Sequence, residues 1–175
     1  MKVFFTVDRN DTLQEDQIIN LTKYIDIEPI KLQEHFDFLF PNGVSSHGEQ
    51  YMVRGDSYAK FPKDLSPLIE LLIEYVRRSF YPEKPSRFQS VFAFDNYEQA
   101  KDFKYRYSDD KSKGSIWQVE ANNFFKADMN LLSLGNSLLE ADYLAHLYWK
   151  GETIGNPFWE YLLVPPVKVI RKVDG

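Results

Sequence analysis

Two adjacent prolines near the end of the chain, Pro165 and Pro166, constrain the fold more than any other feature of the sequence. They separate two segments with the composition of strands, FWEYLLV (158–164) and VKVIRKV (167–173). A connection of two residues is too short for a parallel crossover, which takes about a dozen residues. The two segments are therefore antiparallel strands or bent parts of one run. Either arrangement favours an α+β fold with a mixed or antiparallel sheet over a doubly wound one.

The rest of the sequence alternates between segments typical of strands and of helices. Runs of β-branched and aromatic residues predict strands at 2–8, 50–54, 87–94 and 115–120. Capping residues, prolines and apolar spacing predict helices at about 12–21, 30–40, 66–81, 97–107 and 137–149. In the helix at 66–81, the apolar spacing predicts a buried stripe made of Leu68, Leu71, Leu72, Tyr75 and Val76.

Length and composition limit the kind of protein. At 175 residues we expect one domain that spans residues 1–175. The sequence has no cysteine, which excludes disulfides and thiolate chemistry and suits a reducing compartment. No apolar run reaches the roughly 18–20 residues of a membrane span, and the N-terminal segment lacks the features of a signal peptide, so we expect a cytoplasmic protein. A net charge of −5 argues against a general surface for duplex nucleic acid.

One carboxylate stands out because it interrupts an apolar strand. Glu160 shares one strand face with Phe158, Leu162 and Val164, while the neighbouring aromatic and apolar residues occupy the other face. An ionised carboxylate among such neighbours costs several kcal/mol unless it is paired. Glu160 must therefore have a partner, open onto a cleft or lie at a sheet edge. Active sites collect such groups, which makes Glu160 a candidate functional residue.

The usual signatures of nucleotide-binding and hydrolytic enzymes are absent. The sequence contains no P-loop, no dinucleotide-binding glycine motif, no HExxH and no GxSxG. Its three histidines, His35, His47 and His146, are scattered without metal-ligand spacing, so we predict no metal site. A metal-dependent nuclease is a third functional alternative, although no clustered acidic motif supports it.

Three residues far apart in the sequence form the strongest candidate for chemistry. Arg9 follows the first predicted strand, Ser90 lies within RFQSVFAF, and Glu160 follows a Gly-Asn-Pro loop. This order of arginine, serine and glutamate resembles that of mono-ADP-ribosyltransferases. The segments KVFFTVDRNDTL, PSRFQSVFAFDNYEQAKDF, PFWEYLL and VKVI also resemble a group of uncharacterised bacterial and phage domains thought to share that fold. The resemblance implies a single ADP-ribosyltransferase-like domain whose split sheet holds NAD in a central cleft.

The resemblance also implies an activity and a role for five residues. The activity would be NAD-dependent mono-ADP-ribosyl transfer or NAD hydrolysis. Glu160 would be the catalytic carboxylate, which stabilises the oxocarbenium-like charge that develops on the ribose as the nicotinamide bond breaks. Arg9 would anchor NAD, Ser90 would support the site, and Phe92 or Phe94 would stack on the nicotinamide ring.

The acceptor and the alternative function stay open. Arginine-modifying members of the family carry Glu or Gln two residues before the catalytic glutamate, where this chain has Phe158, so a nucleobase or another protein side chain is an equal candidate acceptor. The alternative is a binding module with an inert cleft that engages a protein partner as an inhibitor or regulator. In that case Arg9 caps a turn, Ser90 bonds to backbone, and Phe92 and Phe94 belong to the core.

Overall fold

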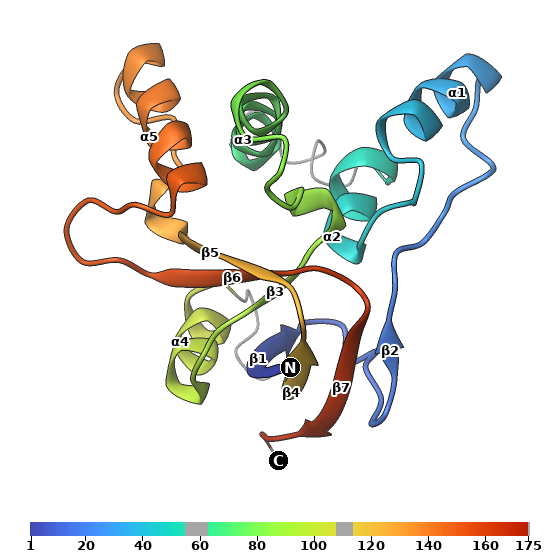
Figure 1. The fold of residues 1–175 in the computed structure, drawn as a ribbon, viewed down its shortest axis with the longest axis vertical. Coiled ribbons are helices and arrows are strands. Elements are labelled where there is room, and N and C mark those ends of the chain that lie inside the picture. The colour runs from blue at the N-terminus through green and yellow to red at the C-terminus, as the bar shows by residue number, and fades with distance from the viewer. Residues whose placement is uncertain (55–62, 108–113, 175) are drawn as a thin grey trace.

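The computed structural model describes residues 1–54, 63–107 and 114–174. In these residues the strands form two antiparallel sheets, with strand orders β1-β4-β7-β2 and β3-β6-β5 (Figure 1). The strands are β1 (Lys2–Asp8), β2 (Ile18–Ile19), β3 (Val91–Ala93), β4 (Ser115–Ala121), β5 (Phe124–Asp128), β6 (Trp159–Leu163) and β7 (Val167–Lys172). Together with its helices, the chain has the α+β fold expected from the sequence.

Two strand pairs bend from one sheet into the other. β6 lies in the smaller sheet, and β7, which follows the two prolines, lies in the larger one. β4 and β5 take the same course in the opposite direction, because β4 pairs with β7 and β5 pairs with β6. The N–H of Val164 donates to the carbonyl of Asn123 at 2.9 Å and links the two bends. The segments on either side of the prolines are therefore bent parts of one run.

The two sheets are also joined through β1 and β3. Phe5 and Phe94 form an isolated antiparallel bridge with two N–H···O=C hydrogen bonds of 2.8 Å. The hydroxyl of Thr6 donates to the carbonyl of Phe92 at 2.7 Å. Since β3 pairs in turn with β6, the strands β1, β3 and β6 are consecutive neighbours in space.

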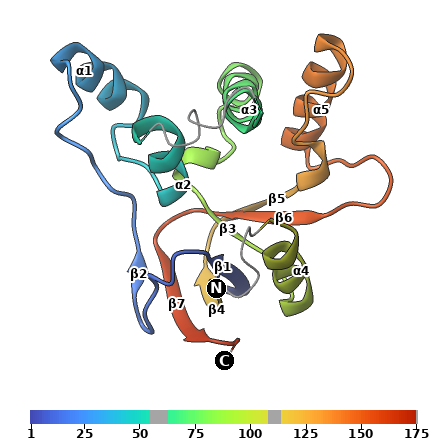
Figure 2. The ribbon, with the colours of Figure 1, turned by 180° about the vertical axis from the view of Figure 1, so that it is seen from behind.

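Helices cover both sides of the smaller sheet. On one side lie α1 (Ile30–Leu39), α2 (Ser46–Gly48), α3 (Ser66–Phe80) and α5 (Leu138–Lys150). α4 (Tyr97–Tyr107) lies on the other side, next to the larger sheet, and the view from behind shows the same division (Figure 2). The short helical segments are η1 (Glu49–Val53), η3 (Arg87–Gln89) and η4 (Met129–Leu131). None of the helices in the described residues is long and apolar enough to cross a bilayer.

The predicted helices at 30–40, 66–81, 97–107 and 137–149 are confirmed, and the one at 12–21 is wrong. In that segment the N–H groups of Thr12 and Leu13 donate to the Asp8 carboxylate at 2.6 and 2.7 Å. The residues expected to start a helix therefore form a turn. The chain then runs extended, and β2 pairs with β7. The predicted strand at 50–54 is also wrong, because most of this segment belongs to the helical turn η1. The predicted strand at 87–94 divides into η3 and the shorter β3.

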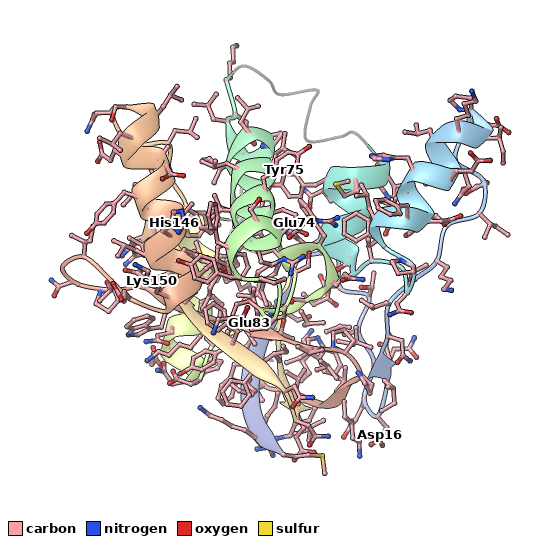
Figure 3. All side chains as sticks on the ribbon, turned by 45° about the horizontal axis from the view of Figure 1, so that its top comes forward. Asp16, Glu74, Tyr75, Glu83, His146 and Lys150 are labelled. Carbon is pink, nitrogen blue, oxygen red and sulfur yellow. The ribbon has the colours of Figure 1, made fainter. Side chains whose placement is uncertain are left out.

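The buried face of α3 agrees with the predicted stripe only in part: Val76 is buried and Leu72 packs against the core as predicted. Leu68, Leu71 and Tyr75 are 38%, 40% and 62% exposed, whereas Glu70 and Glu74 are buried. Glu74 and Tyr75 are labelled on this helix in Figure 3. Apolar spacing placed the three exposed residues in the core because it assumes that carboxylates face water. The helix instead turns Glu70 and Glu74 inward because both carboxylates have cationic partners inside the protein.

Candidate functional site

Glu160 lies on the central strand of the smaller sheet, between β3 and β5. Leu162, on the same strand face, packs in the cluster formed with α3 and α5, whereas Tyr161 packs in the cluster between the two sheets. The Glu160 side chain is 3% exposed and accepts hydrogen bonds from Arg87 and from the Tyr148 hydroxyl, the latter at 2.6 Å. Of the three arrangements that the sequence allowed, the structure shows a carboxylate with internal partners.

Arg87 holds two buried carboxylates together. Its Nε and Nη2 donate to the two oxygens of Glu70, each at 2.9 Å, while Nη1 contacts Glu160 and lies 2.5 Å from the Tyr148 hydroxyl. Glu70 comes from α3, Glu160 from β6 and Tyr148 from α5. A guanidinium suits this position because its planar fork binds a carboxylate through two parallel hydrogen bonds. Arg87 therefore ties two helices to the smaller sheet.

Aromatic rings enclose the guanidinium. The Arg87 guanidinium carbon lies 4.5 Å from the ring centroid of Phe92 and 5.4 Å from that of Tyr148. Cations are attracted to ring faces, and the attraction strengthens where water is excluded. Tyr148 is fully buried, and burial together with the nearby Glu160 carboxylate raises the pKa of its hydroxyl well above the usual value, despite the opposing Arg87 charge. Tyr148 is therefore a neutral hydrogen-bond donor at physiological pH.

His47 extends this group of side chains. Its Nε2 lies 3.2 Å from Glu70 Oε1 without the alignment of a hydrogen bond, and the contact is ionic only when the imidazole is protonated. The imidazole centroid lies 4.7 Å from the Phe92 ring and 4.8 Å from the Tyr51 ring. We call His47, Glu70, Arg87, Tyr148 and Glu160 the buried network.

The charges in the buried network stabilise one another. Burial alone would raise the pKa of Glu70, but the Arg87 and His47 charges outweigh it and hold that pKa well below the usual range. Burial alone would likewise lower the pKa of Arg87, but Glu160 and Glu70 raise it well above its ordinary value. Opposite charges at short range in a poorly hydrated interior favour the ionised forms in this way. At neutral pH, Glu70 therefore carries a full negative charge beside a positive Arg87.

The structure brings two of the predicted site residues near each other. Phe92 is opposite Leu162 on the neighbouring strand and stacks on Arg87, which binds Glu160. Ser90 is buried elsewhere, and its hydroxyl donates to the carbonyl of Ser86 at 2.8 Å. The adjacent Val91 pairs with Leu163, three residues along β6 from Glu160, which corresponds to about 10 Å of strand. Ser90 thus bonds to backbone.

Arg9 and Phe94 lie on the other side of the smaller sheet. The Arg9 guanidinium lies 5.0 Å from the ring centroid of Phe103, a residue of α4. Phe94 is 2% exposed and packs with Phe103 and Phe158 in the core next to α4. Glu160, in contrast, contacts Arg87 and Tyr148 on the side of α3 and α5. The contact of Arg9 with Phe103 and the contacts of Glu160 are therefore made on opposite sides of the sheet.

Sequence reasoning missed most of the buried network. Glu70 and Tyr148 lie in correctly predicted helices, but neither residue was singled out. Arg87 was treated as the first residue of a strand. The available signal was the arginine in PSRFQS, a cation between two apolar stretches that needs a carboxylate partner if it is buried. His47 was noted in the sequence only as one of three scattered histidines.

The described residues offer no group of three or more His, Cys, Asp or Glu side chains that could hold a metal ion. A pocket of about 390 Å³ lies away from Glu160, between α1 and the segments around Ile27 and Val53. NAD would need access to the Glu160 carboxylate, which in this conformation is 3% exposed and bonded within the chain. A ribose could therefore reach Glu160 only by displacing Arg87 or Tyr148 from it.

Comparison with known proteins places the chain in a family. A family model described as a protein of unknown function (DUF2441) matches residues 4–175. A search of curated proteins found no match. Because the match covers nearly all of the chain, the protein belongs to this family.

Proposed function

We propose that this DUF2441 protein acts by binding a protein partner, and that its fold is an ADP-ribosyltransferase-like scaffold whose carboxylate is used internally. The observation that carries the proposal is the state of Glu160, whose side chain is 3% exposed and bonded to Arg87 and Tyr148. A carboxylate that stabilises a ribose cation must reach the sugar. Here the carboxylate holds α3 and α5 on the sheet instead.

The exposed face of α3 supplies the binding surface in this proposal. Leu65, Leu68, Leu71 and Tyr75 recur at helical spacing and are exposed, and we call them the α3 stripe. The carboxylates of the same helix are buried and paired with arginines. An exposed apolar row on a helix suits a partner that presents an apolar groove, since docked helices use anchors at this spacing.

NAD-dependent ADP-ribosyl transfer or NAD hydrolysis is the second candidate. It is favoured by the order of neighbours β1, β3 and β6, because these three strands carry or adjoin Arg9, Ser90 and Glu160. A split pair of sheets with a glutamate on a central strand is what the resemblance to ADP-ribosyltransferases implies. In this second proposal, NAD is the substrate and the acceptor is a protein or a nucleic acid.

One experiment separates the two candidates. Wild-type protein, Glu160→Gln and the exposed control Glu152→Gln are titrated with NAD by calorimetry and assayed for released nicotinamide. The binding proposal expects no NAD binding in the millimolar range and no release by any of the three proteins. Nicotinamide release by the wild type and by Glu152→Gln, with none from Glu160→Gln, would overturn it and favour the enzyme.

A second experiment tests the α3 stripe directly. Proteins captured by the wild type are compared with those captured by Leu71→Glu, with Glu152→Gln as the control. Leu71 is exposed, so its replacement should leave the thermal midpoint unchanged. The proposal expects a partner that the wild type and the control retain and that Leu71→Glu loses. Identical sets of captured proteins would contradict a role for this surface.

A further inference from the structure

One ammonium group lies over a cluster of three aromatic rings between the two sheets. The Lys2 Nζ atom lies 5.0 Å from the ring centroid of Phe4, 5.2 Å from that of Phe124 and 4.8 Å from that of Tyr161. The ring centroids are 5.0, 5.1 and 5.9 Å from one another. The rings come from β1, β5 and β6, so both sheets contribute. We call Phe4, Phe124 and Tyr161 the aromatic cage.

Two of the three rings are held rigidly. Phe4 has no exposed surface and packs in the cluster between the sheets. Tyr161 is 4% exposed, and its hydroxyl donates to Asp95 at 3.0 Å, which fixes the ring orientation. Burial, with a further contribution from the Asp95 carboxylate, raises the pKa of Tyr161 to about 12, so the ring stays neutral. The cage is thus formed before any ligand arrives, which lowers the cost of binding.

The exposure and length of the Lys2 side chain make its ammonium group replaceable. Lys2 is exposed, and it reaches the cage on a flexible four-carbon stem. Phe124 is 41% exposed, so the cage has a side open to solvent. Removal of the lysine side chain would leave the three rings around a space that already accommodates a cation.

We propose that the aromatic cage is a binding site for an N-methylated ammonium group, and that Lys2 occupies it in the absence of ligand. Three ring faces directed at one cation are the arrangement that recognises quaternary ammonium groups. A methylated ammonium is less strongly hydrated than the lysine ammonium and loses less on leaving water. It therefore competes with Lys2 for the same rings.

The test uses choline as the probe and follows its methyl proton resonance by NMR. Aromatic ring currents shift this resonance when the group enters the cage. Lys2→Ala is expected to bind choline in the millimolar range, about tenfold more tightly than the wild type, because the competing cation is gone. Adding Phe124→Ala to this variant should remove most of the binding. Lys126→Ala is the matched control, since Lys126 lies over the single ring of Trp159 at 4.0 Å, and it should bind choline as the wild type does.

A neutral analogue and a modified peptide complete the test. 3,3-Dimethyl-1-butanol has the shape of choline without its charge, and the proposal expects it to bind much more weakly. Equal binding of the two molecules, or no binding of choline by Lys2→Ala, would overturn the proposal. A peptide carrying trimethyllysine separates the two sources of the ligand. Tighter binding of this peptide than of choline indicates a modified protein, and weaker or equal binding indicates a small molecule.

Discussion

Replacement of Arg87 by methionine should destabilise the protein strongly at neutral pH. Arg87 is buried and bonded to Glu70, Glu160 and Tyr148. Methionine fills a similar volume but leaves two carboxylates without their counter-ion, in positions that are 6% and 2% exposed. Removing one partner from a buried ion pair typically costs about 3–5 kcal/mol. Since domains have a total stability of about 5–15 kcal/mol, the loss is a large fraction of the free energy of unfolding.

The pH dependence gives this prediction a definite sign. In the wild type, the folded-state pKa of Glu70 lies below its unfolded value of about 4.3. Its contribution to stability is therefore complete above that pH and is lost as pH falls through the folded pKa. In Arg87→Met, the guanidinium no longer opposes the effect of burial, which raises the pKa of the Glu70 carboxyl. Protonation then relieves the variant, which should become more stable as pH falls from 7 toward 5.5.

Urea denaturation at pH 7 and pH 5.5 measures both effects. The free energy of unfolding of Arg87→Met should rise over this interval, whereas that of the wild type should not gain from these groups. Arg77→Met is the matched control. Arg77 also binds a buried carboxylate, Glu74, but that carboxylate keeps hydrogen bonds from Arg78 and Ser86 at 2.7 and 2.9 Å. The control should lose about 1–2 kcal/mol, with little dependence on pH.

The reasoning would be refuted if Arg87→Met lost less than about 1 kcal/mol of unfolding free energy at pH 7, because an unpaired buried charge destabilises a protein by more than that. If the variant does not fold at pH 7, the triple variant Arg87→Met, Glu70→Gln, Glu160→Gln keeps the prediction testable. It removes all three charges and should regain much of the lost stability. A triple variant no more stable than Arg87→Met would show that shape, rather than charge, governs this centre.

Two further substitutions test local features of the fold. Ser137→Ala removes the side chain that accepts from the N–H of Glu140 at the start of α5, and thermal denaturation should show a loss of about 1 kcal/mol; no change would show that this cap is unused. Gly48→Ala should destabilise by at least about 1–3 kcal/mol in urea, because the new Cβ would lie 2.2 Å from the carbonyl oxygen of Phe88. A gain in stability, as helix propensity alone would give, would contradict this close approach.

Local sequence signals identified the helices whose starting residues lie within a few positions of the groups that they cap or precede. Ser137 and Pro29 stand at the starts of α5 and α1, and the helix prediction in each case followed from the chain itself. The helix prediction at 12–21 was wrong because of another local interaction. Thr12 has the composition of a helix cap, but its N–H and hydroxyl both contact Asp8, which favours a turn over a helix start.

Nonlocal interactions account for what the sequence could not reveal. The face that α3 buries depends on Arg87, which is 17 residues from Glu70 in sequence. Glu160 lies 73 residues from Arg87. Apolar periodicity treats each helix alone and assigns carboxylates to water. It cannot show that a cation from a distant segment will be buried against the same helix, so Leu68, Leu71 and Tyr75 were assigned to the core.

The two interpretations of Glu160 differ in the free energy needed to expose it. A buried carboxylate in an apolar strand requires partners whether it is structural or catalytic, so the sequence signal is the same in both cases. Here the partners are Arg87 and Tyr148, and separating the charges costs about 3–5 kcal/mol. A ligand that needs the open state has its apparent affinity reduced by that amount, about a hundredfold to a few thousandfold. For turnover at Glu160, NAD would therefore have to form new bonds to Glu160 and to its partners as they separate. Binding of a partner at the α3 stripe would leave the buried network intact.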